Sequence, residues 1–271
     1  MSEIFLIVIL LSAFAVVVFL FGLTFFGFLD DVSIYFFHKP FYIHFYLRPK
    51  DISPEQENIL VQRFKFYNTL SDRHKVYFRH RMACFIRKYE YIPRDGVVIN
   101  EEIVTLIAAT YVMLTFGIRH YLLESFDKII IYPEPYLSTQ SQEYYKGEFN
   151  PRMKAVVFSW KDFVEGHETT HDNLNLGIHE FSHVVHLHSL KNNDGSSLAF
   201  RKHHARLVKE VNHPANRQRL IDSDYFRIYA YTNHFEFISV IIEHYFETPQ
   251  EFKSKFPQLF HNVSLMLNHK H

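Results

Sequence analysis

Five consecutive residues near the middle of the chain have the types and spacing of a metal-dependent hydrolase site. They are His179-Glu180-Phe181-Ser182-His183. On an α-helix, residues i and i+4 lie on one face, so both imidazoles can bind one metal ion, and such a pair is typical of zinc. The carboxylate of Glu180 would lie beside that ion, where it can accept a proton from water and pass it to a leaving amine. The motif therefore predicts a metallopeptidase.

The motif alone is a modest signal, because the chain has 19 His among its 271 residues. Its surroundings strengthen the prediction. Apolar residues recur around it at helical spacing: Leu174, Ile178, Phe181 and Val185. This pattern gives a helix one apolar face and leaves the two His on the other. We expect a helix over about residues 173–189, capped by Asp172 or Asn173.

Two His residues leave a catalytic zinc site one ligand short, because such sites have three protein ligands and one open position. The metzincin pattern would need Gly and His where His186 and Ser189 stand, so that class is excluded. His186 itself lies one turn farther along the helix, where it is poorly placed to share a tetrahedral ion with His179. The third ligand must come from elsewhere in the chain.

A second amphipathic helix, opened by Thr232 or Asn233, carries two carboxylates. Glu236 and Glu243 are seven residues apart and so share a face. Beside them lies an apolar stripe: Phe237, Val240, Ile241 and Tyr245. A ligand His usually donates its second N–H to a carboxylate or carbonyl group, so Glu243 could orient one of the two His. On spacing alone, both Glu could equally be solvated or structural.

At these residues the chain resembles zinc-dependent peptidases related to Mlc titration factor A, a bacterial cytosolic group whose catalytic region is similar to the anthrax lethal factor protease domain. The resemblance covers residues 53–259. Its matching pieces are Ile107–Ala109, Ile129–Pro133, Val157–Trp160, Asn175 with the motif, and Tyr229–Pro249. It implies an α+β, mainly helical, zincin-like domain with a small sheet.

The resemblance also implies roles for single residues. It assigns as ligands of one Zn²⁺ the side chains of His179, His183 and Glu236. Glu180 becomes the catalytic base, and Tyr229 lies near the open metal position, where its phenol would stabilise an oxyanion. The implied substrate is a peptide or protein. The chain departs from the family after the motif, where a Leu-Asp pair is usual and residues 184–188 read Val-Val-His-Leu-His. That departure puts substrate preference in doubt more than zinc binding.

A long apolar run opens the chain. Residues 4–29 carry no charge, and as a helix they would reach about 39 Å, longer than a hydrocarbon core of about 30 Å. A cleaved signal peptide is disfavoured, because no Lys or Arg precedes the run and no small-residue cleavage site follows it. We predict a transmembrane anchor over residues 1–31, a juxtamembrane segment over 32–52 and a zinc peptidase domain over 53–271.

The nearest basic residues, Lys39 and Arg48, both follow the apolar run, which favours a cytoplasmic domain on a single-pass inner-membrane protein. The single Cys84 excludes an internal disulfide and fits a reducing compartment. Residues 33–50 are rich in aromatic and basic side chains. That composition suits contact with lipid headgroups, but a strand of the domain is an equally good interpretation.

The rest of the domain is predicted to be mostly helical. Helices should begin after the caps Ser53, Ser71 and Asn100, and short strands should lie near residues 128–132 and 154–160. The basic helix after Ser71 is interpreted as a solvated face. By analogy with other zinc proteases, residues 155–159 would lie along the cleft and bind an extended substrate backbone.

Composition excludes one class of partner. The chain has 29 Lys plus Arg against 29 Asp plus Glu and a pI near 7.4, so there is no general electrostatic case for nucleic acid. Two alternatives to a peptidase remain at this stage. One is a zinc scaffold that sequesters a cytoplasmic regulatory protein with little proteolysis. The other is a metal buffer that uses His-rich positions: His167, His171, His186 and His188.

Overall fold

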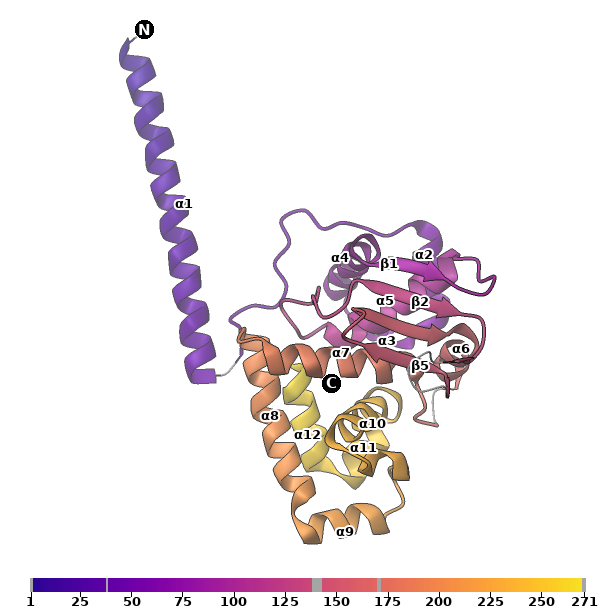
Figure 1. Cartoon of the computed structure of the whole chain (residues 1–271). Coiled ribbons are helices and arrows are strands. Elements are labelled where there is room, and N and C mark those ends of the chain that lie inside the picture. The colour runs from indigo at the N-terminus through magenta and orange to yellow at the C-terminus, as the bar shows by residue number, and fades with distance from the viewer. Residues whose placement is uncertain (1, 38, 138–142, 170–171, 270–271) are drawn as a thin grey trace.

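The computed structural model describes residues 2–37, 39–137, 143–169 and 172–269. One long helix, α1 (Ser2–Phe37), stands apart from a folded body (Figure 1). Within the body, α7 (Leu176–Lys191) runs between a part that contains the sheet and a part made of the helices that follow it (Figure 1). The body is mainly helical with a small sheet, as the sequence predicts.

Helix α1 is long and apolar enough to cross a membrane, by length and composition. Its mean hydropathy is 3.3, and in the part of the chain that the structure describes none of its most apolar window is buried. The helix continues past residue 31, the predicted end of the anchor, to Phe37. Residues 4–29 of this helix carry no charged side chain, so over that length it has no charged face.

The sheet has four strands in the order β1-β2-β6-β5. Their bounds are β1 Glu90–Pro93, β2 Lys128–Tyr132, β5 Gly147–Asn150 and β6 Ala155–Ser159. The first three in this order pair in parallel, and β5 pairs antiparallel with β6. Strand β6 is therefore paired on both sides, so the prediction that it lies at a free edge along the cleft is wrong. The edge strand on this side of the sheet is β5, and β1 is the edge strand on the other side.

Helices cover one face of the sheet. They are α2 (Pro54–Arg63), α3 (Lys65–Thr69), α4 (Asp72–Lys88), α5 (Glu101–Thr115) and α6 (Trp160–Glu168). The predicted caps are confirmed, because the side chains of Ser53, Ser71 and Asn100 each accept a backbone N–H of the first turn. Helix α5 is apolar on nearly all sides and buried from Thr105 to its end, as expected for a core helix between α2, α4 and α7.

The other face of the sheet has a smaller apolar cluster around Ile130 and Val157. Tyr136 packs against this cluster from a short hairpin of β3 (Tyr136–Leu137) and β4 (Tyr144–Tyr145). Successive residues of β2 point to opposite faces of the sheet. Ile130 packs in this smaller cluster, whereas Ile129 and Ile131 face the main core, so both faces of β2 are covered.

One residue of the basic helix contradicts the predicted solvated face. Arg81 on α4 is completely buried. Its guanidinium donates to the carbonyl oxygens of Thr115 and Phe116, at 2.8 and 3.2 Å, and to the hydroxyl of Tyr46 at 2.8 Å. The last carbonyl groups of a helix have no hydrogen-bond donor within that helix. Arg81 therefore supplies the donors for the carbonyl groups at the buried end of α5.

Seven short helical segments complete the body after β6 and α6. Besides α7 they are α8 (Gly195–Asn212), α9 (Pro214–Asp222), the 3₁₀ turn η1 (Ile228–Tyr231), α10 (His234–Glu247), α11 (Pro249–Lys255) and α12 (Pro257–Leu267). Asn233 caps α10, as predicted. The predicted start of α7 is wrong, because Asn175 is its cap and Leu174 lies outside the helix, 53% exposed.

The segment between α1 and α2 has no regular structure in its described residues, so the strand interpretation is wrong there. Its start is fixed to the end of α1. Both carboxylate oxygens of Asp30 accept from Arg119 at 2.6 Å, and the backbone N–H of Phe41 donates to Asp30 at 2.9 Å. These bonds join α1 to the loop that follows α5.

Candidate metal centre

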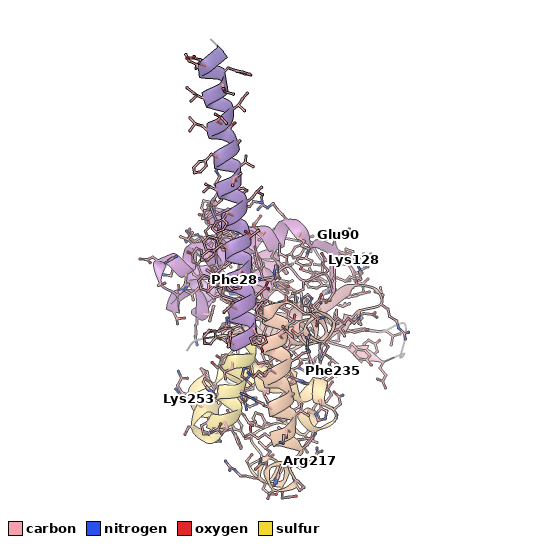
Figure 2. The ribbon with its side chains drawn as sticks, turned by 90° about the vertical axis from the view of Figure 1, so that its left-hand side faces the viewer. Phe28, Glu90, Lys128, Arg217, Phe235 and Lys253 are labelled. Carbon is pink, nitrogen blue, oxygen red and sulfur yellow. The ribbon has the colours of Figure 1, made fainter. Side chains whose placement is uncertain are left out.

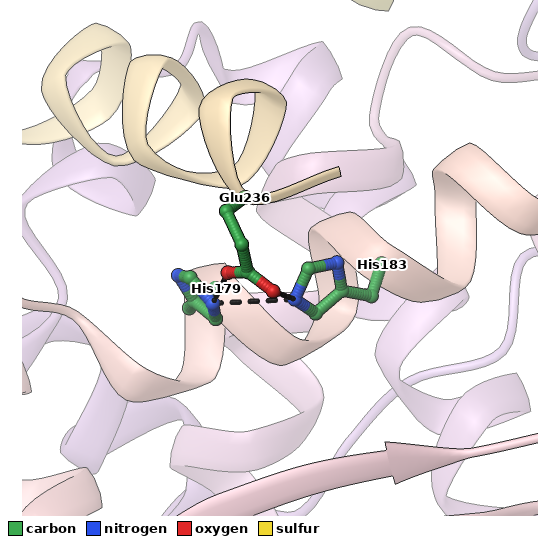
Figure 3. A group of neighbouring side chains, drawn as sticks. All are labelled: His179, His183 and Glu236. Atoms are coloured by element: carbon green, nitrogen blue, oxygen red, sulfur yellow. Dashed lines mark hydrogen bonds and ion pairs between the residues drawn. The ribbon is translucent and has the colours of Figure 1, made fainter. Parts of the chain in front are cut away.

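Three side chains from two helices converge at the centre of the body (Figure 3). Helix α7 presents His179 and His183 one turn apart, and α10 presents Glu236 from its first turn. The Nε2 atoms of the two His are 3.2 Å apart, and the Glu236 carboxylate lies 3.0 Å from the first and 3.6 Å from the second. One ligand atom from each residue lies within 4.8 Å of the others, a group that could hold a metal ion.

The contacts of the two Nδ1 atoms orient the imidazole rings so that the Nε2 atoms face Glu236. His179 Nδ1 donates to Glu243 Oε1 at 2.7 Å, and His183 Nδ1 lies 3.2 Å from the hydroxyl of the buried Ser239. When each Nδ1 carries the proton and donates it, to Glu243 from His179 and to the Ser239 hydroxyl from His183, both Nε2 lone pairs are free to bind a cation. Two imidazole nitrogens and one carboxylate oxygen are the donor set of many catalytic zinc sites, so the residues fit that ion.

Glu243 orients His179 and has no capacity left for a metal. It is 1% exposed. Arg227 donates to both of its oxygens at 2.7 and 3.1 Å, and the backbone N–H of Asn175 donates to it at 3.0 Å. The structure thus brings Glu243 to the place expected for an orienting carboxylate.

Glu180 lies on α7 between the His pair and strand β5. It is 6% exposed, and the backbone of Phe149 hydrogen-bonds to its carboxylate. Gly147 allows this contact, because a Cβ at Gly147 would lie 3.2 Å from Glu180 Cγ and 2.7 Å from Leu176 Cδ1. Burial, with the nearby Glu236 carboxylate, raises the pKa of Glu180 to about 7. A carboxylate with such a pKa can both accept and return a proton near neutral pH.

Tyr229 lies on η1, beside the candidate metal ligands. Its side chain is half exposed, its ring centroid is 6.2 Å from that of His179, and its hydroxyl hydrogen-bonds to Glu236. Burial, with the negative charge of Glu236, raises the pKa of Tyr229 to about 12. The phenol therefore remains protonated at neutral pH and can donate a hydrogen bond.

Sequence reasoning missed three residues of the site. Ser239 follows Glu236 by three positions, so helical spacing could have indicated it. Arg227 precedes Tyr229 by two residues in a non-helical segment, where no periodicity marks it. Tyr136 has a buried hydroxyl with no hydrogen-bond partner among the described residues, and Glu180 is one of the charges that raise its pKa.

The His residues of the metal-buffer interpretation do not come together. His167 Nε2 donates to the carbonyl of Arg63 at 2.9 Å, and His188 lies 3.8 Å from Asp194. His186 is buried between Phe235 and His204, with ring centroids 4.3 and 4.5 Å away. His171 lies outside the described residues.

The geometry defines a class of protein. A His pair on one helix, a Glu on a second helix and a buried Glu beside them form a group that could hold a metal ion, an arrangement typical of metallopeptidases. Residues 43–267 match the family model described as glucose-regulated metallo-peptidase M90. The chain belongs to this family, which includes Mlc titration factor A. The match includes part of the predicted juxtamembrane segment.

One curated relative is similar over most of its length. It is a protein of Synechocystis sp. described as uncharacterized protein slr2042. The two are 24% identical over 235 residues, which cover 78% of this chain and 82% of the relative. The similarity therefore covers most of both chains, and the description of the relative does not state a function.

Proposed function

We propose that the protein is a membrane-anchored, single-zinc peptidase with a zincin-like catalytic domain. The observation that carries this proposal is the convergence of His179, His183 and Glu236 beside the buried Glu180 (Figure 3). Membership of a metallopeptidase family supports it. The apolar helix α1 supports anchoring, and Lys39 and Arg48 on its C-terminal side favour a cytoplasmic domain.

His179, His183 and Glu236 would hold the zinc ion. When bound, zinc supplies Lewis-acid chemistry to a substrate carbonyl and lowers the pKa of a nearby water. Glu180, buried beside the proposed ligands, accepts the proton of the attacking water and delivers it to the leaving amine. Tyr229 donates its phenolic hydrogen to the oxyanion that develops on the carbonyl.

The free edge of β5 is the proposed binding site for an extended peptide. Hydrogen bonds alternate along an antiparallel pair, and Lys146 O accepts from Ser159 N on β6. The backbone groups of Gly147 and Phe149 then face away from β6, and Phe149 is already bonded to Glu180. A substrate strand could pair with the outward groups of Gly147, which would bring its scissile bond close to Glu180.

The test uses the full chain purified in detergent. We expect about one zinc per chain, cleavage of members of a peptide library, loss of cleavage with chelator and its return with zinc. Glu180→Gln should keep the zinc but slow cleavage by about 10²–10⁴-fold, because the amide cannot accept a proton. The exposed Glu251→Gln on α11 is the matched control and should cleave normally. Wild-type cleavage by metal-replete Glu180→Gln would refute the mechanism.

A further inference from the structure

The end of α1 is joined to the body through buried polar contacts. Asp30 is 8% exposed, and its bidentate pair with Arg119 leaves neither oxygen free. Gly195, the first residue of α8, lies so close to Ile34 that a Cβ there would be 2.8 Å from the Ile34 side chain. Ser196 in turn accepts the backbone N–H of Arg119 at 3.2 Å. The direction of α1 is therefore fixed relative to the body.

Residues 39–50, which we call the post-helix segment, are held to the body by some of their side chains. His44 stacks on Tyr77, with centroids 4.9 Å apart. The hydroxyl of Tyr46 accepts from the buried Arg81 at 2.8 Å, and the backbone N–H of Lys50 donates to His80 at 2.8 Å. These contacts determine which side chains of the segment face outward.

The outward side chains are large and apolar. Exposed fractions are 53% for Phe41, 41% for Tyr42, 68% for Phe45 and 86% for Leu47. Exposed basic residues accompany them: Lys39, Arg48 and Lys50. Contiguous apolar exposure beside basic residues is typical of a surface that contacts anionic lipid headgroups. The last turn of α1 adds further exposed aromatic side chains: Tyr35, Phe36 and Phe37.

The position of the segment identifies its partner. From the end of α1, the segment runs back along the side of the body toward the N-terminal end of α1 (Figure 1). In Figure 2, Glu90 and Lys128, at the starts of β1 and β2, lie somewhat nearer the N-terminal end of α1 than Phe28, which is near the end of the apolar run. The segment thus lies on the side of the body from which α1 projects, the side that a bilayer holding α1 would meet (Figure 1).

We propose that the post-helix segment lies in the headgroup region of the membrane, with Phe45 and Leu47 inserted toward the acyl chains. Together with the contacts of Asp30, this second attachment fixes the orientation of the catalytic domain on the lipid surface. The inference rests on the proposed insertion of α1 and is independent of peptidase activity.

The experiment measures the depth of single labelled positions in the full chain. In a Cys84→Ser background, one cysteine is introduced at a time and labelled with the environment-sensitive NBD group: Val17→Cys, Leu47→Cys or Ile221→Cys. Each protein is reconstituted in vesicles of phosphatidylcholine and phosphatidylglycerol that carry spin-labelled lipid. Val17 reports on α1. Ile221 is 46% exposed on α9, at the opposite end of the body, near Arg217 (Figure 2).

We expect lipid quenching at positions 17 and 47 and none above background at 221. Leu47 is 86% exposed, so the substitution should not disturb folding. Quenching at 17 with none at 47 would overturn this inference and leave the anchor in place. The exposed side chains of the segment would then be free to contact a protein partner instead of lipid. Absence of quenching at 17 would overturn both the anchor and the inference.

Discussion

At the scale of single residues, the site depends on a carboxylate that does not touch the metal position. A buried carboxylate is costly unless it is paired and hydrogen-bonded. Glu243 meets this requirement with three donors: His179, Arg227 and Asn175. Arg227 donates to both oxygens of Glu243, and the Glu243 carboxylate in turn holds His179 with Nε2 directed at Glu236.

Glu243→Gln should therefore weaken zinc without removing a ligand. The amide has only one acceptor oxygen for three donors, so the hold on His179 is partly lost, and such changes lower metal affinity about 10–100-fold. Glu236→Gln should lower it further because it alters a ligand. Affinity is measured by competition with a chromogenic chelator, with circular dichroism to verify the fold. An unchanged affinity in Glu243→Gln would show that its contact with His179 has no role in metal binding.

The predictability of the site differs from residue to residue. The i,i+4 spacing of His179 and His183 was enough to place both on one face of α7. Glu236 required the family resemblance, because its partner helix lies more than fifty residues away and spacing alone left it equivalent to a surface Glu. Arg227 could not be found, since its role depends on a contact with Glu243 that only the folded chain creates.

At the scale of elements, the cap of α10 positions Glu236, the proposed third metal ligand. The side-chain oxygen of Asn233 accepts the backbone N–H of Glu236 at 3.0 Å. Asn233→Ala should lower the free energy of unfolding by about 0.5–2 kcal/mol and also weaken zinc, because the first turn that carries Glu236 loosens.

Asn100→Ala is the matched control, since Asn100 caps α5 through Ile103 at 2.9 Å and is not part of the metal centre. It should cost similar stability with no change in zinc affinity. Denaturant unfolding with chelator and zinc titration separate the two effects. Equal zinc affinities in both variants would contradict a positioning role for the cap.

The cap of α8 should make stability depend on pH. Asp194 accepts the backbone N–H groups of Ser196 and Ser197 at 3.0 and 3.2 Å. Burial opposes ionisation of Asp194, but the neighbouring His188 and the hydrogen bonds from Ser197 outweigh it and hold the Asp194 pKa well below its usual value. A lowered folded-state pKa means stabilisation that is complete above the unfolded-state pKa of about 3.9 and is lost as pH falls.

Asp194→Asn should thus be less stable than wild type at pH 7 by up to about 1.5–3 kcal/mol, the range for hydrogen bonds to a charged group. The difference should narrow as pH falls from about 5 to about 2, because Asp194 is protonated in the unfolded chain before it is protonated in the folded one, and this uptake of a proton favours unfolding. Denaturant unfolding in detergent across this range provides the measurement. A difference that does not change with pH would mean that the charge of Asp194 has no part in the cap.

Elements were predictable where local chemistry decides them. Asn100 and Asn233 are caps because each precedes an apolar helical pattern, which is readable in sequence. The cap of α7 was misassigned because Asn173 and Asn175 are locally equivalent. Tertiary contacts choose between them: the Asn175 amide donates to Gly166 O and to Glu247, both at 3.0 Å. Strand β5 was missed because four residues that include a glycine carry no alternation.

At the scale of the whole molecule, the pair of Asp30 and Arg119 determines how α1 meets the body. Removing one partner of a buried pair costs about 3–5 kcal/mol, so Arg119→Gln should release the helix from its fixed direction. The measurement is the distance distribution between spin labels at Tyr35 on α1 and Leu190 on α7, both exposed. We expect a narrow distribution in the wild type and a broad one in Arg119→Gln.

Arg73→Gln is the control, because the exposed Arg73 contacts only its own helix through Tyr77 in the described bonds. It should leave the distribution narrow. An equally narrow distribution in Arg119→Gln would mean that apolar contacts alone hold α1.

The junction at Asp30 and Arg119 also determines the height at which the domain meets its substrates. A flexible linker would let the site sample many distances from the lipid, whereas a fixed junction holds it at nearly one. With α1 in a bilayer, a substrate tethered to the same membrane must reach that height with an extended segment of its own, at about 3.3–3.6 Å per residue. Substrates would then be selected by the number of residues between the lipid surface and the scissile bond. Specificity would depend on the length of this segment as well as on the side chains around the scissile bond.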